Sequence, residues 1–287
     1  MKKRVLLLGL VVLMVLTSCG TTEKETKTKE KDPDKLVLNI EDKKEDDIQE
    51  EQTDMQEQAS QPDGQSQAEE VNEQQPQKNG HLIAIDAGHQ AKGNSEKEPV
   101  GPGSSEMKAK CTSGTQGTYS GDPEYQLNLE VSLQLKDELE QRGYQVVMTR
   151  TDNETAISNM ERAQYAASQG AEIYVRIHAN GDDSHTASGA LTMSPSQNNP
   201  YIPQLFEQSD RLSRCIIDSY CAATGFQNLG IQYTDTMTGI NWSTVPVTIL
   251  EMGFMTSQND DLKMNDAEFQ KTMVQGIANG IDSYFAS

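Results

Sequence analysis

Three short apolar runs, each leading into an ionisable side chain, are the feature that most constrains the fold of this chain. The runs occupy residues 82–86, 173–177 and 245–250. They are followed closely by His89, His178 and Glu251. Runs that are apolar at nearly every position are typical of buried strands in a parallel sheet. Because open α/β sheets gather their functional groups at the carboxyl ends of the strands, we expect these three side chains to meet in one crevice.

Segments with helical spacing alternate with strand-like segments over residues 81–287, which predicts an α/β fold. Further strands are expected at residues 144–150, 189–193 and 230–234, the last as an edge strand. We predict a single domain with a twisted, mostly parallel sheet of about six strands, flanked by helices on both faces. Residues 90–122 are rich in Gly, Ser, Thr and Lys without sustained periodicity, so they predict a long functional loop or mobile lid.

Three helices have recognisable ends. Glu124 lies in the first turn of a helix with regularly spaced apolar residues, and Gly143 follows as its C-terminal cap. Ser158 and Glu161 have the spacing of a capping box for the next helix. Asp266 can cap a final helix that carries a single apolar stripe.

The first 80 residues differ in character from the rest. Residues 1–19 join a short basic segment to an apolar stretch that is too short to favour a spanning helix. Their end, Leu-Thr-Ser-Cys, resembles the bacterial lipobox, so we expect a lipoprotein signal with a lipidated Cys19; an ordinary signal peptide is the alternative. Residues 20–80 hold 18 Asp and Glu, 8 Lys, no aromatic residue and many Gln. This composition predicts a disordered acidic linker that tethers residues 81–287 to the membrane.

Charge and cysteine content narrow the chemistry of the domain. It contains 26 Asp and Glu against 13 Lys and Arg, so nucleic acid is not an expected partner. Cys111, Cys215 and Cys221 lack the Cys-x-x-Cys spacing of a metal site or redox motif. They are expected to be small core residues, and a bond from Cys111 to one of the other two stays open. The nucleophile elbow Gly-x-Ser-x-Gly and the phosphate-loop pattern are both missing from the sequence.

Two histidines and a carboxylate are the ligand types of a hydrolytic zinc site, and a further Glu can act as its base. Each residue alone also has a structural interpretation, since a single His near a strand end is more often hydrogen-bonded than metal-bound. Glu251 is harder to explain, because a carboxylate after six apolar residues is costly to bury without a partner. Taken together, they favour a zinc hydrolase. His81 and His185 lie in a junction and a polar loop and are expected to be solvated.

Four spaced motifs carry a family resemblance. In chain order they are Ile85-Asp86-Ala87-Gly88-His89, Glu124-Tyr125-Gln126-Leu127-Asn128-Leu129, Ile177-His178-Ala179-Asn180 and Leu250-Glu251-Met252-Gly253-Phe254. This set resembles the zinc-dependent N-acetylmuramoyl-L-alanine amidases of the type-3 family over essentially all of residues 82–285. The resemblance implies that His89, Glu124 and His178 bind Zn²⁺ and that Glu251 is the catalytic carboxylate. It also implies a peptidoglycan substrate, cleaved at the amide between N-acetylmuramic acid and the L-alanine of the stem peptide.

The chain departs from the family pattern at three places beside these motifs. Residues 90–93 read Gln-Ala-Lys-Gly after the first His, where the family usually continues with glycine. Arg176 stands where a small residue is commoner, and Met252 stands where Thr is usual. These departures bear on substrate details more than on the chemistry.

On this basis we expect a monomeric peptidoglycan hydrolase outside the cytoplasm, anchored to the membrane through Cys19; the sequence identifies no activator. A catalytically silent peptidoglycan-binding lipoprotein and a zinc carboxypeptidase acting on stem peptides are the alternatives. The product distinguishes them, because an amidase frees intact stem peptides with an L-alanine amino terminus, whereas a peptidase trims them.

Overall fold

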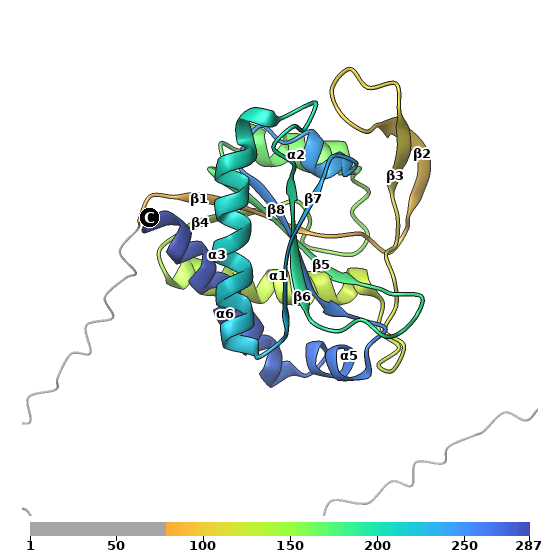
Figure 1. Cartoon of the computed structure of the whole chain (residues 1–287), viewed down its shortest axis with the longest axis vertical. Coiled ribbons are helices and arrows are strands. Elements are labelled where there is room, and N and C mark those ends of the chain that lie inside the picture. The colour runs from red at the N-terminus through yellow and green to blue at the C-terminus, as the bar shows by residue number, and fades with distance from the viewer. Residues whose placement is uncertain (1–78) are drawn as a thin grey trace, which may run out of the picture. The chain divides into compact units, whose positions relative to one another are not determined.

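The computed structural model describes residues 79–287 and builds them around one six-stranded sheet (Figure 1). Its strands are β1 (Leu82–Ala87), β4 (Gln145–Met148), β5 (Ile173–Asn180), β6 (Ala190–Pro195), β7 (Asn228–Thr234) and β8 (Val247–Phe254). They lie in the order β4-β1-β5-β8-β6-β7, and every neighbouring pair is parallel except β6 with β8. The predicted α/β class, with about six mostly parallel strands and β7 at an edge, is confirmed.

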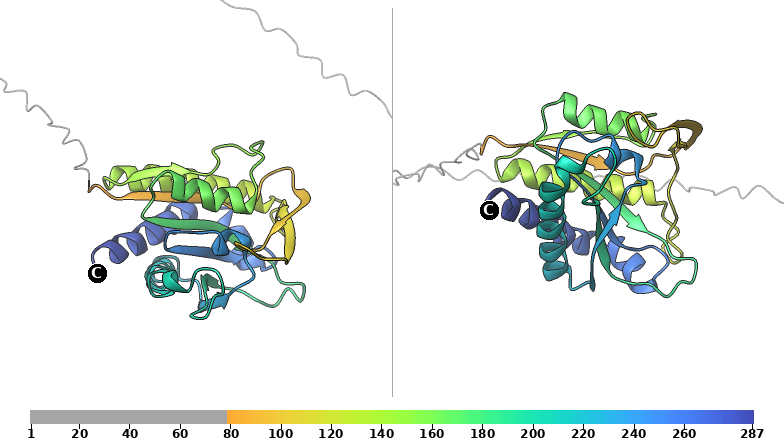
Figure 2. Two further views of the ribbon diagram at one scale, coloured as in Figure 1. Left: turned by 90° about the horizontal axis from the view of Figure 1, so that it is seen from above. Right: turned by 45° about the horizontal axis from the view of Figure 1, so that its top comes forward.

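Helices cover both faces of this sheet (Figures 1 and 2). They are α1 (Glu124–Gln141), α2 (Asn159–Ser168), the 3-10 turn η1 (Pro203–Leu205), α3 (Phe206–Thr224), α4 (Thr238–Asn241), α5 (Gln258–Met264) and α6 (Ala267–Phe285). Residues of α1, α3 and α6 form one apolar cluster with Ile83, Ile177 and Leu250 of the sheet. Residues of α2, η1 and α4 form a second cluster with Ala84 and Tyr174. The alternation of side chains along each strand therefore divides the core into two layers.

The predicted helix ends have a physical basis in the structure. Ser158 and Glu161 form both hydrogen bonds of a capping box at the start of α2. The Asp266 carboxylate accepts a hydrogen bond from the backbone N–H of Phe269 at the start of α6. Gly143, after the end of α1, adopts φ 89°, a conformation that L-residues rarely take.

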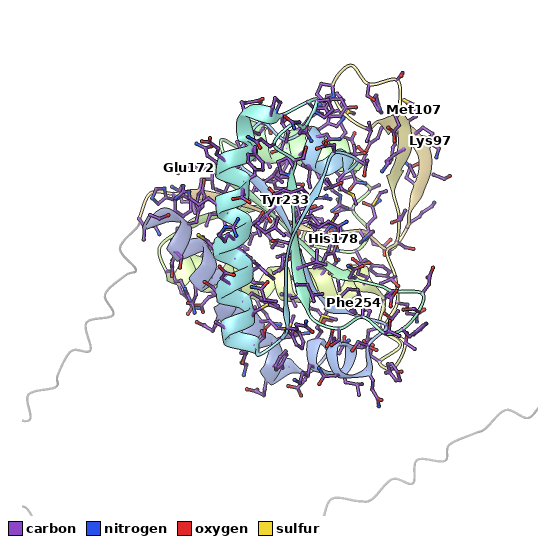
Figure 3. All side chains as sticks on the ribbon, viewed as in Figure 1. Lys97, Met107, Glu172, His178, Tyr233 and Phe254 are labelled. Atoms are coloured by element: carbon purple, nitrogen blue, oxygen red, sulfur yellow. The ribbon has the colours of Figure 1, made fainter. Side chains whose placement is uncertain are left out.

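Two expectations about element boundaries were wrong. β5 and β8 continue beyond their apolar runs, so His178 and Glu251 lie inside strands and not at their ends. Residues 90–122 are not a wholly irregular loop, because β2 (Asn94–Pro99) and β3 (Met107–Cys111) pair as an antiparallel hairpin. The hairpin stands apart from the main sheet and therefore lacks the apolar pattern of a buried strand. Figure 3 shows its residues Lys97 and Met107 at the periphery, while His178 lies centrally.

The order of the strands explains where a site can form. From β1 the chain passes through α1 to β4, and from β4 it returns through α2 on the opposite face to β5. The connections thus diverge between β1 and β5, and a crevice opens at their carboxyl ends, as in other open α/β sheets.

Three further predictions concern the amino-terminal residues 1–80, a membrane-spanning helix and a disulfide bond. The predicted signal at residues 1–19, including Cys19, and nearly all of the linker at residues 20–80 lie outside the described residues. Within residues 79–287, no helix has the length and apolar character needed to cross a membrane. Cys111, Cys215 and Cys221 are free thiols, so the disulfide that the sequence left open does not form.

Candidate metal centre and active site

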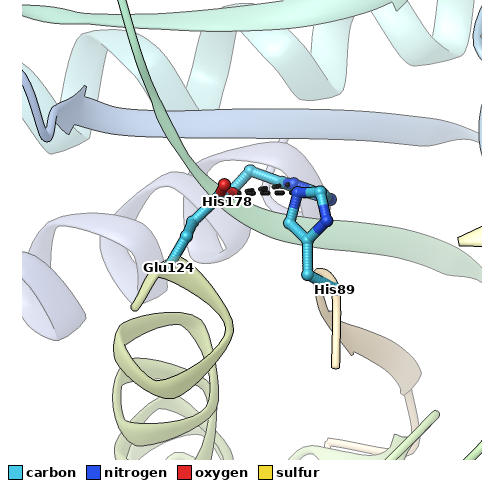
Figure 4. Close-up of side chains that lie close together, drawn as sticks. All are labelled: His89, Glu124 and His178. Carbon is cyan, nitrogen blue, oxygen red and sulfur yellow. Dashed lines mark ion pairs between the residues drawn. The ribbon is translucent and has the colours of Figure 1, made fainter. Parts of the chain in front are cut away.

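Two imidazoles converge on one carboxylate oxygen of Glu124 (Figure 4), one from the loop after β1 and one from β5. Nε2 of His89 lies 3.1 Å from Oε1 of Glu124, and Nδ1 of His178 lies 3.3 Å from the same oxygen. Candidate ligand atoms from the three side chains all fall within 4.8 Å of one another. The structure thus brings together three residues that the sequence places far apart, on the loop after β1, the first turn of α1 and β5.

The loop that follows β1 holds the backbone of His89 in an unusual conformation. His89 has φ 62°, in the left-handed region that residues with a side chain rarely adopt, and such strain is typical of functional sites. Its Nδ1 lies 3.0 Å from the carbonyl oxygen of Thr112, an interaction that leaves Nε2 directed at Glu124. Gly88 is required beside it, because a Cβ there would lie 2.3 Å from the ring of His178.

Glu124 is buried and is held as a carboxylate by a ring of donors. Its Oε1 accepts hydrogen bonds from the backbone N–H of Ala179 and from the side chain of Asn128, both at 3.2 Å. Its Oε2 accepts one from the backbone N–H of Thr115 at 2.9 Å. Burial alone would raise the pKa of Glu124, but hydrogen bonds from His178 and His89 hold that pKa well below its usual value. The site therefore carries a negative charge that a cation can neutralise.

His178 has the properties of a metal ligand. Burial lowers the pKa of its imidazole to about 4, although Glu124 opposes the shift, so the ring is neutral at physiological pH. Its Nε2 is buried and has no hydrogen-bond partner among residues 79–287. Structural histidines normally satisfy both ring nitrogens, so an unpaired nitrogen fits a ligand better. Two neutral imidazoles and one carboxylate are the donor set of a catalytic zinc site, and these residues fit that ion.

Glu251 faces the same crevice from the neighbouring strand. In the register of β5 and β8 it lies directly beside His178, so both side chains project from one face of the sheet. Burial raises the pKa of its carboxyl group to about 8, the charge of Glu124 adds to the rise, and Arg176 opposes it. Glu251, His89 and His178 line a pocket of about 250 Å³, to which β3 and α4 contribute further walls. All four predicted chemical residues thus meet at one place.

Comparison with known proteins agrees with this geometry. Residues 83–283 match the family model Amidase_3, described as N-acetylmuramoyl-L-alanine amidase. The chain belongs to this family. The predicted enzyme class, N-acetylmuramoyl-L-alanine amidase, is thereby confirmed.

Individual relatives of the amidase cover the same part of the chain. It is 29% identical to the uncharacterized protein YqiI of Bacillus subtilis (strain 168), over 72% of this chain and 85% of YqiI. It is 27% identical to the N-acetylmuramoyl-L-alanine amidase LytC of the same organism, over 72% of this chain and only 36% of LytC. Among solved structures, the amidase Ami1 of Mycobacterium smegmatis has a TM-score of 0.66 and 25% identity, covering 72% of this chain and 97% of Ami1.

A buried ionic network under the amidase pocket was missed by the sequence analysis. Asp86 is fully buried and accepts hydrogen bonds from Nη1 of Arg162 at 2.7 Å and from Nε of Arg176 at 2.8 Å. Burial opposes ionisation of Asp86, yet the two guanidinium groups hold its pKa well below the usual value. A charged residue inside each of two apolar runs was the available signal, because such residues are buried only with partners.

The same network positions the loop that carries His89. Arg162 donates hydrogen bonds to the carbonyl oxygens of Ala87 and His89, each at 2.8 Å. Arg150 donates to the carbonyl oxygens of Ala87 and Gly88 at 2.8 and 3.0 Å. These bonds fix the backbone on both sides of the strained His89.

The two remaining histidines lie away from the pocket. His81 stacks on Phe285 with ring centroids 4.0 Å apart, and its Nδ1 lies 3.0 Å from the Glu172 carboxylate. His81 is therefore packed against the last helix as well as partly solvated, which the sequence did not predict. His185 lies exposed in the loop after β5, as expected for a solvated residue.

Proposed function

We propose that this amidase is a zinc-dependent peptidoglycan hydrolase that cleaves the amide between N-acetylmuramic acid and the L-alanine of the stem peptide. The observation that carries the proposal is the convergence of His89, Glu124 and His178 beside Glu251 in one pocket. Family membership supplies the bond that is cleaved, and the pocket supplies the residue types that such chemistry requires.

Each residue has a distinct role in this proposal. His89, Glu124 and His178 would hold the metal through two neutral imidazoles and one carboxylate. A bound Zn²⁺ supplies a Lewis acid and lowers the pKa of water. Glu251 accepts a proton from the attacking water and delivers it to the departing amine, because an amide nitrogen must be protonated to leave. Its raised pKa suits this exchange, since a carboxyl group that titrates near neutrality can both take and release a proton.

The amino-terminal region supports a proposal about location. A lipidated Cys19 would anchor the chain at the outer side of a bacterial membrane, and the acidic linker of residues 20–80 would extend toward the wall. Residues 81–287 would then act as a monomeric catalytic domain on a polymer lying above the bilayer. The support is the composition of residues 1–80, and metabolic labelling with a palmitate analogue in wild type and Cys19→Ala tests it.

Digestion of purified peptidoglycan tests the catalytic proposal. The full-length chain is incubated with the polymer in the presence of zinc, of a chelator, and of chelator followed by zinc, and released fragments are analysed by mass spectrometry. We expect intact stem peptides with an L-alanine amino terminus, lost with chelator and restored by zinc. Trimmed stem peptides would identify a carboxypeptidase instead. Retention on peptidoglycan without any product, in zinc-loaded protein, would identify a silent binding protein.

A further inference from the structure

Arg176 is a buried cation in the wall of the catalytic pocket. It lies on β5 two residues before His178, so both side chains project from the same face of the sheet. Only 3% of Arg176 is exposed, yet it lines the pocket together with His178 and Glu251. Lys108, from β3, lines the same pocket and donates a hydrogen bond from Nζ to the carbonyl oxygen of Thr236 at 2.6 Å.

Arg176 shares its carboxylate partner with another arginine. Asp86 already pairs with Arg162, so a single carboxylate faces two guanidinium groups. Arg150, also buried, donates its bonds to carbonyl oxygens and to the side-chain amide of Asn153. Arg150, Arg162 and Arg176 thus outnumber Asp86, the one carboxylate of this network, and Glu251 across the pocket is a further carboxyl group near Arg176. Buried charges without full pairing are costly.

Two of the three guanidinium nitrogens of Arg176 donate hydrogen bonds that fix the orientation of the group. Nε donates to Asp86, and Nη2 donates at 3.0 Å to Oδ1 of Asn159, whose amide donates in turn to the carbonyl oxygen of Lys110. With the ring centroid of Tyr174 5.9 Å from the guanidinium carbon, Nη1 is the nitrogen that takes part in neither bond. It lies against Gly239 of α4, where a Cβ would come within 2.5 Å of it. Gly239 does not have a positive φ, so its backbone conformation does not require glycine. The missing side chain instead leaves room for Nη1 of Arg176.

The spacing between Arg176 and the catalytic residues suits a peptide. Two residues along a strand separate Arg176 from His178, roughly 7 Å at the rise of a β-strand. Two residues of an extended peptide cover about the same distance. A substrate whose scissile amide lies at Glu251 and His178 would therefore bring the residue after its L-alanine to Arg176.

We propose that Arg176, with Lys108 as a second cation, binds the free α-carboxylate of the residue that follows L-alanine in the stem peptide. The pocket would thereby favour stem peptides with a carboxylate at this position over those with a carboxamide. This inference rests on the proposed function, because it assigns a subsite to the same substrate. A guanidinium N–H donates a charge-assisted hydrogen bond to a carboxylate, which is stronger than the bond it can make to a neutral carboxamide.

Two synthetic N-acetylmuramoyl tripeptides that differ only in this group, carboxylate or carboxamide, test the proposal. Steady-state kinetics of the zinc-supplemented full-length chain should show kcat/KM at least about tenfold higher for the carboxylate, as one charge-assisted hydrogen bond allows. Arg176→Met should abolish this preference by raising KM for the carboxylate, and Arg176→Lys should retain part of it. Gly239→Ala, which crowds Nη1 but keeps every charge, should reduce the preference in a fold left intact.

The outcomes separate the subsite from the activity. Cleavage of neither tripeptide by zinc-loaded wild type would overturn the proposed function. Equal cleavage of both by wild type would overturn the carboxylate subsite alone. A preference that persists in both Arg176→Met and Gly239→Ala would remove Arg176 from the role. An equal fall of kcat for both substrates in Arg176→Met would show that Arg176 acts on Glu251 and not on substrate.

Discussion

The two faces of the central sheet are buried by different means, although the same strands supply both. Toward α1, α3 and α6 the strands present Ile83, Ile85, Ile177 and Leu250, which belong to one apolar cluster with these helices. Toward α2 and α4 the alternate positions are charged or polar where they approach the carboxyl ends of the strands. They are Asp86, Arg176, His178 and Glu251. The pleat of each strand therefore separates the residues of the apolar cluster from the residues that line the candidate site.

This difference determines how each face responds to substitution. The apolar face gains stability from buried area, which a single truncation removes in proportion to its size. On the polar face stability depends on complete pairing, because removing one partner leaves the other charged and buried. The following experiments compare the two faces, beginning with the largest expected effect.

Asp86→Ala should cause the largest loss of stability. The substitution leaves Arg162 and Arg176 without their carboxylate in a buried site, so we expect the free energy of unfolding in urea to fall by about 3–5 kcal/mol. Because folding lowers the pKa of Asp86, its ionisation contributes stability above the unfolded pKa of about 4, and this contribution is lost as pH falls further. The gap between wild type and variant should therefore narrow below about pH 4. A loss that stays the same at every pH would contradict this account.

Leu135→Ala is the matched substitution on the apolar face. Leu135 is fully buried in the cluster of α1, α3 and α6, so its truncation should cost about 2–5 kcal/mol of unfolding free energy. Neither kcat nor KM should change at temperatures where the variant is folded, and the loss should not vary between pH 3 and 7. An altered KM in folded Leu135→Ala protein would show that the two faces are coupled.

Glu251→Gln should leave the fold intact and remove activity. We expect zinc content, measured by atomic absorption, to equal that of wild type, while turnover on peptidoglycan falls by at least about 10²-fold. The amide has the shape of the carboxyl group but cannot exchange a proton. Wild-type turnover in zinc-loaded Glu251→Gln protein would exclude this carboxylate as the acid and base.

Removing the N-terminal caps of α2 and α6, one helix on each face, should have the smallest effects on stability. Ser158→Ala and Asp266→Ala each remove one N-terminal capping bond, so each should cost about 1 kcal/mol in the free energy of unfolding. Only Ser158→Ala should also lower kcat/KM, because α2 carries Arg162, which holds the backbone of His89. Equal catalytic losses in both variants would indicate a general effect of stability.

Much of the fold followed from local patterns in the sequence. Apolar runs marked β1, β5 and β8, and the caps at Ser158 and Asp266 marked the helices, because these signals arise from neighbouring residues. The hairpin of β2 and β3 was missed because its side chains are mostly polar and its position depends on distant contacts. Lys108, for example, bonds to Thr236, 128 residues further along the chain.

For the candidate site, the sequence predicted the residues that come together but not the contacts that surround them. His89, His178 and Glu251 follow apolar runs that must be buried, so their convergence could be inferred before any contact was known. The proposed role of Arg176 could not be inferred, since it depends on the sharing of Asp86 between two guanidinium groups and on the close approach of Gly239. Strand order and register, which place these groups together, are properties of the whole sheet.

The position of Glu251 in the chain has a consequence for synthesis and breakdown of the protein. β8 is the last strand of the sheet to be synthesised, so a ribosome-bound or truncated chain that ends before it has both imidazoles and Glu124 but lacks Glu251. The four side chains of the candidate site therefore come together only after β8 has been synthesised. A protease that removes the final segment would take away β8, which lies between β5 and β6, and with it Glu251 and part of the apolar core.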